Sequence, residues 1–167
     1  TAAVSESSSI SGKLDYDNAV LELDEAYLNP AFDEFNPDIV LVTNLFRDQL
    51  DRYGELNTTA LKIETAIEKS AKTKPLKLLL NTDDPLVSRI ASDFNDNGIE
   101  RVYYGFEEIK LAETGENCYS PQETINCACG RSFNYNKIFY GHLGFYECKC
   151  GIKRESPNIT AKALVDN

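Results

Sequence analysis

Four short apolar runs, separated by polar and helical segments, set the pattern of this chain. The runs cover residues 19–23 (AVLEL), 38–43 (DIVLVT), 76–80 (LKLLL) and 100–104 (ERVYY). Aliphatic, β-branched and aromatic residues dominate them, and the first two have the composition of strands covered on both faces. We therefore predict four strands, with residues 24–37 as a short crossover between the first two.

Helical spacing replaces this pattern between the second and third runs. Apolar side chains recur on roughly one face of a helix that starts near residue 57: Leu61, Ile63, Ile67 and Ala71. Pro75 marks its end, and Asp84–Pro85 opens a second helix with an acidic N-cap and a proline in the first position. Strands that alternate with helices predict an α/β fold, a parallel sheet flanked by helices.

Polar side chains gather where the predicted strands end. Such clusters cover residues 22–25, 44–51 and 81–84, and ligands of open parallel sheets bind at the carboxyl ends of the strands. We expect the three clusters to line one rim. The segment 43–55 is denser in polar groups than a connection requires, so it is either a site loop or a network of surface ion pairs.

Glu22 stands inside an otherwise apolar run. A carboxylate in a buried strand needs a partner or a cation to offset its desolvation, and Mg²⁺ takes carboxylate oxygens together with substrate phosphates. Glu22 is therefore a candidate magnesium ligand. The alternative is an alternating strand that keeps Glu22 and Asp24 on a solvated face, and both interpretations stay open at this point.

Two matching cysteine clips near the end of the chain give the strongest signal for a metal. Each has two cysteines one residue apart, followed by glycine: Cys127-Ala128-Cys129-Gly130 and Cys148-Lys149-Cys150-Gly151. A tight turn behind two thiolates lets them converge on one ion, and glycine supplies the backbone freedom for it. Residues 130–147 between the clips fit a strand, a turn and a return strand. We predict a zinc ribbon with a closed tetrahedral four-thiolate site, which is structural and not catalytic.

Alternatives to this ligand set remain. The C-x-C spacing departs from the usual C-x-x-C of zinc ribbons, so Cys118 is a reserve ligand that could replace Cys127. Disulfides are the alternative to zinc, but five cysteines would leave one unpaired in an oxidising compartment. His142, the only histidine, lies between two glycines of the expected hairpin turn, and we interpret it as a turn residue and not as a fifth ligand.

The charge balance and the lack of long apolar stretches narrow the classes of partner. The chain has 17 basic and 27 acidic side chains, a formal net charge of −10, which argues against nucleic acid. No run approaches the roughly 18 apolar residues of a transmembrane segment, and the N-terminus lacks the layout of a signal peptide. We expect a cytoplasmic protein.

These patterns divide the chain into four parts. Residues 1–18 are polar and serine-rich and are expected to be flexible, and residues 19–105 hold the alternating strands and helices. Residues 106–156 form an insertion with its own metal staple. Residues 157–167 begin a strand that returns to the sheet or starts another. The chain contains no methionine, even at its start, and we expect an excised piece with some partner strands missing.

Four segments followed by a four-cysteine ribbon resemble the central domain of the Mur ligase family. The segments are VLELDEAYL (20–28), VTNLFRDQLDRYGE (42–55), LLLNTDDPLVSRI (78–90) and YYG (103–105). Ordinary Mur ligases have no such ribbon, and the closest resemblance is to the Mur-ligase-like subunits of lipid II isoglutaminyl synthases. Residues 19–105 would then be a partial ATP-binding domain of the Mur type, and residues 106–156 its zinc-ribbon insertion.

The resemblance implies an activity. In that family ATP phosphorylates a substrate carboxylate, and an amine or ammonia displaces phosphate from the acyl phosphate. For this branch it implies amidation of the stem-peptide glutamate of lipid II at the cytoplasmic membrane face, with ammonia from a separate glutaminase-like subunit. The GKT phosphate loop and the carboxyl-terminal domain of the family lie outside the matched region, so we expect the isolated chain to be inactive.

The resemblance also implies site residues. Glu22 matches the magnesium-binding glutamate, Asn81 matches the asparagine that contacts adenine, and Asn44, Asp48 and Gln49 fall in the magnesium and phosphate loop. Amino-acid-adding Mur ligases usually have a metal-binding histidine where Gln49 stands, which favours the isoglutaminyl synthase branch. Catalytic groups are not identified. The competing hypotheses are a zinc-stapled interaction module without nucleotide chemistry, and a Mur-type ligase that adds an amino acid.

Overall fold

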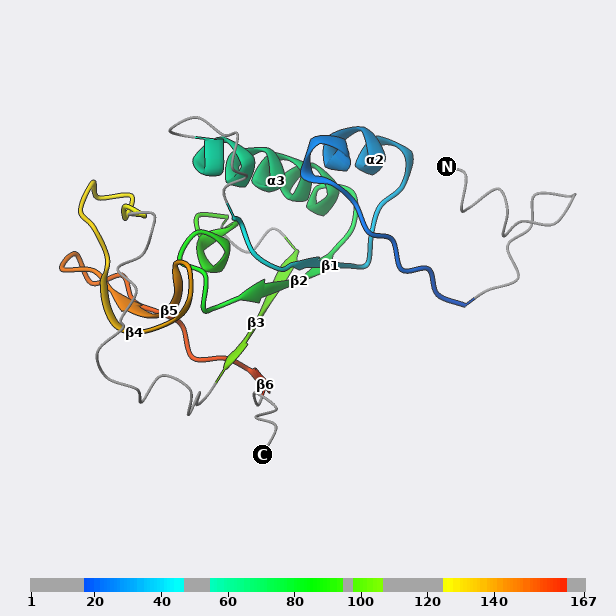
Figure 1. Ribbon diagram of the computed structural model, residues 1–167. Helices are drawn as coiled ribbons and strands as arrows, with labels where there is room; N and C mark the ends of the chain where they lie inside the picture. Colours follow the sequence, from blue (N-terminus) through cyan, green and yellow to red (C-terminus); the bar gives the residue numbers. More distant parts are fainter. Residues whose placement is uncertain (1–16, 47–54, 95–97, 107–124, 162–167) are drawn as a thin grey trace, which may run out of the picture.

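The structure, a computed structural model, describes residues 17–46, 55–94, 98–106 and 125–161 and contains one four-stranded sheet (Figure 1). Its strands, in sheet order, are β1 (Ile39–Val42), β2 (Leu76–Asn81), β3 (Ile99–Phe106) and β6 (Ile159–Ala161). Every neighbouring pair is parallel. The predicted parallel α/β sheet is confirmed, and the chain after residue 157 returns to this sheet beside β3.

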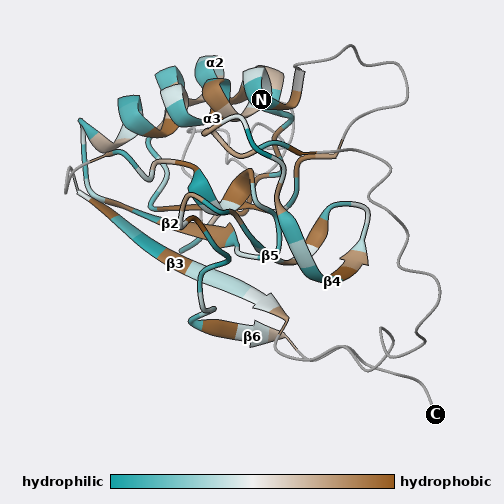
Figure 2. Ribbon diagram, turned by 90° about the vertical axis from the view of Figure 1, so that its left-hand side faces the viewer, coloured by the Kyte–Doolittle hydropathy of each residue, from teal (hydrophilic) through white to brown (hydrophobic). Residues whose placement is uncertain are grey.

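Helices cover one side of the sheet. They are the 3₁₀ turn η1 (Glu25–Tyr27), α2 (Leu28–Glu34), α3 (Glu55–Ala71) and the 3₁₀ turn η2 (Val87–Arg89). Helices α2 and α3 contact each other and lie on the same side in both views (Figures 1 and 2). In the ranges that the structure describes, none of the helices combines the length and the apolar character needed to cross a bilayer.

Helix α3 confirms the predicted helix and packs its apolar face on the sheet. Ile63 and Ile67 share one buried cluster with Leu78 and Leu80 of β2, and all four are at most 4% exposed. Each such side chain contributes about 1.5–3 kcal/mol by leaving water. Leu61 does not belong to this face, contrary to the prediction. It is 60% exposed, because it lies about 200° around the helix axis from Ile63.

The second predicted helix is only the short turn η2. Asp84 caps this turn as expected, accepting the backbone N–H groups of Leu86 and Val87. The turn ends at Ile90, whose ψ of 128° leaves the helical region. Ala91 then takes a φ of 60°, and left-handed backbone at a non-glycine residue interrupts a right-handed helix.

The first predicted strand, 19–23, is absent from the structure. Residues 17–24 are exposed and unpaired, and Val20 is 97% exposed. An apolar run becomes a strand only if a neighbouring strand satisfies its backbone N–H and C=O groups, and none of the described residues does so. Asp24 instead caps η1, accepting the N–H of Ala26 at 2.8 Å.

Strand β1 is covered on one face and not on two. Val40 and Val42 are buried, whereas Ile39 and Leu41 are 59% and 55% exposed. The prediction that this strand is covered on both faces is therefore wrong for the described part of the chain. Val40 and Val42 belong to the buried cluster that includes residues of α2 and α3, and no described element covers the other face of β1.

A β-hairpin stands between β3 and β6 in sequence. Strands β4 (Asn134–Tyr140) and β5 (Leu143–Glu147) pair antiparallel, which confirms the hairpin predicted between the cysteine clips. Its own small core contains Ile125, Phe133 and Tyr146 together with two of the cysteines. Gly144 is required by space, because a Cβ there would stand 2.1 Å from the carbonyl oxygen of Lys137.

Candidate functional site

Two asparagines meet at the carboxyl ends of β1 and β2. Asn81 is the last residue of β2 and Asn44 lies two residues beyond β1. The Nδ2 of Asn81 donates to the Oδ1 of Asn44 at 2.6 Å, and its Oδ1 accepts the backbone N–H of Asp83 at 3.0 Å. These bonds fix the orientation of the Asn81 amide, which is 8% exposed. The structure thus brings two of the candidate nucleotide residues together.

Strand β3 supports the same edge through Tyr104. The Tyr104 hydroxyl donates to the carbonyl oxygen of Val42 at 3.0 Å, at the end of β1. Burial raises the pKa of Tyr104 to about 12, and the carboxylates of Asp84 and Asp83 add to the shift. The phenol therefore stays protonated at neutral pH and acts as a donor. We call this edge, formed by Asn44, Asn81 and Tyr104, the rim.

Asp83 connects the rim to the chain that follows the hairpin. The residue is buried; its Oδ1 accepts the Nε–H of Arg154 at 2.8 Å and its Oδ2 accepts the N–H of Phe106 at 2.9 Å. Arg154 also donates from Nη2 to the Phe106 carbonyl oxygen and lies over the ring of Phe145. Burial raises the pKa of Asp83, although the Phe106 N–H and Arg154 act in the opposite direction.

Asp84 is fully buried and connects three segments. Its Oδ1 caps η2, and its Oδ2 accepts the N–H of Leu45, the residue after Asn44, at 2.9 Å. The Nε2 of His142, in the hairpin turn, lies 3.2 Å from the same Oδ2. His142 is thus in the turn, as predicted, but it is also 2% exposed and faces a carboxylate.

The four clip cysteines converge at one point. Their sulfur atoms all lie within 4.8 Å of one another. The Sγ atoms of Cys127 and Cys150 are 3.5 Å apart, as are those of Cys129 and Cys148. A tetrahedral ion with metal–sulfur bonds of about 2.3 Å holds its thiolates about 3.8 Å apart. The donor set therefore fits a four-thiolate zinc site.

The backbone forms two identical turns behind these sulfurs. In each clip the first cysteine donates its N–H to the carbonyl oxygen four residues later, and the glycine donates to the carbonyl oxygen of that cysteine. Gly130 and Gly151 take φ values of 80° and 99°, which only glycine adopts without strain. The predicted reason for a glycine after each clip is therefore correct.

The cysteine environment also bears on the ligand set. All four clip cysteines are free, with sulfurs much farther apart than the roughly 2.0 Å of a disulfide bond. The N–H of Ile152 lowers the pKa of Cys150 to about 7, whereas burial raises the pKa of Cys127. Cys127 lies among the four sulfurs despite the short C-x-C spacing, and Cys118 lies outside the described residues.

Of the remaining sequence candidates, the structure describes only Glu22, which lies away from the rim. Glu22 lies on the exposed segment 17–24 and makes no hydrogen bond or ion pair with the described residues. In Figure 1 this blue segment approaches α2 from the right, whereas the β4–β5 hairpin lies on the left. Asp48 and Gln49 lie outside the described residues. Of the three polar clusters expected at one rim, the described part of 44–51 meets 81–84, and 22–25 does not join them.

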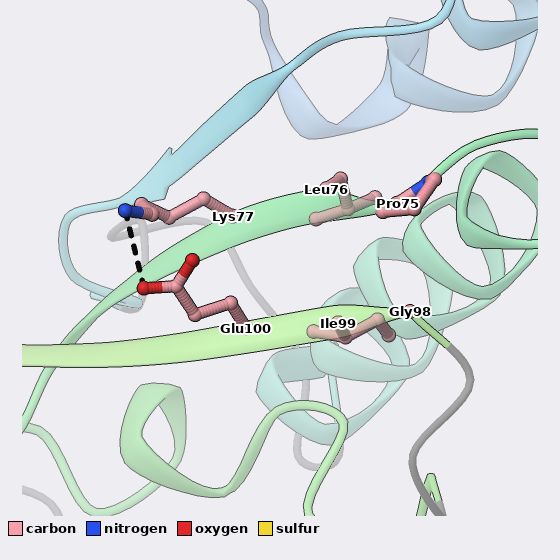
Figure 3. A pocket seen from close by; sticks show the side chains of 6 residues that line it. All are labelled: Pro75, Leu76, Lys77, Gly98, Ile99 and Glu100. Carbon is pink, nitrogen blue, oxygen red and sulfur yellow. Dashed lines mark ion pairs between the residues drawn. The ribbon is translucent and has the colours of Figure 1, made fainter.

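A shallow cavity of about 430 Å³ lies at the other end of the sheet (Figure 3). It is lined by residues at the amino ends of β2 and β3, among them Lys77 and Glu100, which form an exposed ion pair at 3.1 Å. Ligands of open parallel sheets bind at the carboxyl ends of the strands. This cavity is therefore not the candidate site.

Sequence analysis missed three residues that connect the rim to the rest of the fold. Asp83 was not singled out, Arg154 was not considered, and His142 was placed in a turn without a partner. Two adjacent aspartates directly after a fully apolar strand were the available signal, because buried carboxylates require cationic or N–H partners. The side-chain partners Arg154 and His142 come from positions 71 and 58 residues away, so the sequence did not identify them.

Comparison with known proteins places these features in a family context. The profile of the Mur ligase middle domain matches residues 4–145. A solved structure, that of a pseudomurein peptide ligase type C from Methanothermus fervidus, is similar with a TM-score of 0.60 and 33% identity, over 82% of this chain and 25% of that chain.

Two relatives carry the name lipid II isoglutaminyl synthase (glutamine-hydrolyzing) subunit MurT. The protein from Staphylococcus aureus (strain COL) is 40% identical over 143 residues, 82% of this chain and 29% of that protein. The protein from Streptococcus pneumoniae (strain ATCC BAA-255 / R6) is 37% identical over 150 residues, 89% of this chain and 31% of that protein. The chain thus spans less than a third of the length of these relatives.

Proposed function

Because the chain belongs to the Mur ligase family through its middle domain, we propose that it forms the nucleotide-binding rim of an ATP-dependent, amide-forming ligase subunit. The substrate is the stem-peptide glutamate of lipid II, and a glutamine amidotransferase-like subunit delivers the ammonia. The names of the two relatives support this assignment. We place the reaction at the cytoplasmic face of the membrane, where the resemblance puts lipid II.

The observation that carries the proposal is the Asn44–Asn81 pair at the ends of neighbouring parallel strands. Within the described residues, one Nδ2 hydrogen of Asn81 is used by Asn44, and the other is free to donate to a ring nitrogen of adenine. Asn44 leads directly into the segment that holds Asp48 and Gln49, the proposed magnesium and phosphate residues. The pair therefore connects base recognition with phosphate recognition.

The residues of this chain act by binding and orientation. When bound, Mg·ATP would transfer its terminal phosphoryl group to the glutamate carboxylate and leave as ADP, and ammonia would then displace inorganic phosphate from the acyl phosphate to give the amide. The Asn81 amide, held on both sides, presents a fixed donor to the base, and Tyr104 holds the end of β1 in place through the Val42 carbonyl. Glu22 is the proposed magnesium ligand, which requires the segment 17–24 to lie at the rim when nucleotide is bound.

Zinc has a structural role in this proposal. Cys127, Cys129, Cys148 and Cys150 would hold it, and four thiolates leave no coordination position for water or substrate. The small hairpin core has few buried residues, and a module of this size needs such a staple to stay folded.

The proposal is tested with the full-length protein and its glutaminase partner, supplied with lipid II, glutamine and ATP. We expect an amidated stem peptide, detected by mass spectrometry, and a loss of product when Asn81→Ala is introduced. A product that gains a whole amino acid would identify an amino-acid-adding ligase. A protein that binds no nucleotide at all would favour an interaction module stapled by zinc.

A further inference from the structure

One carboxylate joins the hairpin to the rim. The Oδ2 of Asp84 accepts the N–H of Leu45 at 2.9 Å and lies 3.2 Å from the Nε2 of His142. Leu45 follows Asn44, so this contact fixes the backbone directly beside one member of the asparagine pair. His142 comes from the turn between β4 and β5, 58 residues farther along the chain than Asp84.

His142 is held in place from several directions. The hydroxyl of Tyr135 donates to its carbonyl oxygen at 2.9 Å, and its ring lies 5.2 Å from the ring of Phe46. Phe46 also packs edge-on against Tyr140 at 5.6 Å, on the other side of the turn. The hairpin turn therefore contacts both residues that follow Asn44, one through Asp84 and one through aromatic packing.

The Nε2 of His142 is buried, and within the described residues no acceptor is aligned for a regular hydrogen bond with it. The Oδ2 of Asp84 lies 3.2 Å from it. Leaving a donor unsatisfied in the interior costs free energy, so a buried imidazole here needs a compensating electrostatic contact. The Asp84 carboxylate provides that contact.

We propose that His142 is a positioning residue for the rim: through Asp84 it fixes Leu45, and thereby the orientation of Asn44 toward Asn81. The β4–β5 hairpin with its two cysteine clips then helps to order the nucleotide site and is not only a structural scaffold. This inference rests on the proposed function for its effect on nucleotide binding. Its structural half, the restraint on Leu45, stands without it.

Two amide variants and one control separate positioning from general stability. His142→Gln can place an amide Nε2 near the position of the wild-type imidazole Nε2, whereas the shorter side chain of His142→Asn cannot reach Asp84. The control is Tyr146→Phe, which removes a buried bond of 2.6 Å between the hairpin and Ser88 of η2 but breaks no hydrogen bond of the Asp84 carboxylate. His142→Leu, which fills the space without a donor, replaces His142→Asn if that variant does not fold.

The readouts are Mg·ATP affinity by calorimetry and amide hydrogen exchange at Leu45, both in the full-length protein. We expect His142→Asn to weaken Mg·ATP binding roughly tenfold and to speed amide exchange at Leu45. His142→Gln should keep the wild-type affinity and the wild-type exchange rate. Tyr146→Phe should leave both at the wild-type value. The inference is overturned if His142→Asn leaves Leu45 exchange unchanged, or if Tyr146→Phe has the same effect. A wild-type protein that binds no Mg·ATP contradicts the proposed function, while the exchange result still decides the positioning role.

Discussion

Arg154 and Asp83 form a buried ion pair across 71 residues of sequence. Nε donates to Oδ1 at 2.8 Å and Nη2 lies 2.7 Å from the same oxygen, with the two side chains 9% and 2% exposed. Asp83 stands two residues beyond Asn81, and Arg154 lies between the second cysteine clip and β6. This pair therefore joins the segment after the β4–β5 hairpin to the chain beside the rim.

Removing Arg154 should strongly destabilise the fold. Arg154→Ala leaves the carboxylate of Asp83 buried without its cation, and breaking a buried pair on one side costs about 3–5 kcal/mol. Lys77→Ala is the control, because Lys77 and Glu100 form an exposed pair worth less than about 1 kcal/mol. Urea unfolding measures both. Equal losses of unfolding free energy in the two variants would show that the Arg154–Asp83 pair does not hold the segment after the hairpin to the sheet.

The raised pKa of Tyr104 predicts that the fold loses stability at alkaline pH. Its pKa is raised to about 12 in the fold, above the value of about 10 for a free phenol. Below pH 10 the phenol is protonated in both states; as pH rises from 10 to 12 the unfolded state loses its proton first and is favoured. Tyr104→Phe should cost about 1 kcal/mol at pH 7 through the lost bond to Val42. The gap between variant and wild type should narrow from pH 10 upward, in unfolding experiments at each pH, and a constant gap would contradict the assignment.

The four-thiolate site predicts one zinc ion per chain. Cys127→Ser, which removes a ligand from the first clip, should lose the metal, and Cys118→Ser should keep it because Cys127, Cys129, Cys148 and Cys150 already supply the four thiolates of a tetrahedral site. Metal content by mass spectrometry after purification without chelator measures this. Zinc that survives Cys127→Ser but not Cys118→Ser would exchange the roles of these two cysteines.

Local pattern was sufficient for the elements whose signal lies within a few residues. The strands at 39–42, 76–81 and 99–106 coincide with the predicted apolar runs. Ile63 and Ile67 repeat at helical spacing. The cysteine clips with their glycines predict the converging sulfurs for the same reason, because each turn is closed within five residues. These features need no information about distant parts of the chain.

The predictions that were wrong or incomplete concern features that depend on distant parts of the chain. The run at 19–23 resembles a strand, but a strand also needs a neighbour, and none of the described residues pairs with it. The sequence analysis explained Asp84 as a helix cap. That role is correct for Oδ1, but it does not account for the hydrogen bond that Oδ2 accepts from Leu45. The meeting of Asn44 and Asn81 followed from the rule that parallel strands end at one edge, whereas the roles of Arg154 and His142 depend on how the hairpin packs.

The most direct test of the account is Mg·ATP binding to the full-length protein by calorimetry, with Asn44→Ala, Asn81→Ala and the control Asn36→Ala. Asn36 also forms a side-chain hydrogen bond, to Thr73, but away from the rim. We predict that the first two variants weaken binding at least about tenfold, equivalent to about 1.4 kcal/mol, and that Asn36→Ala binds as wild type does. Wild-type affinity in both rim variants would contradict the claim that Asn44 and Asn81 hold the nucleotide.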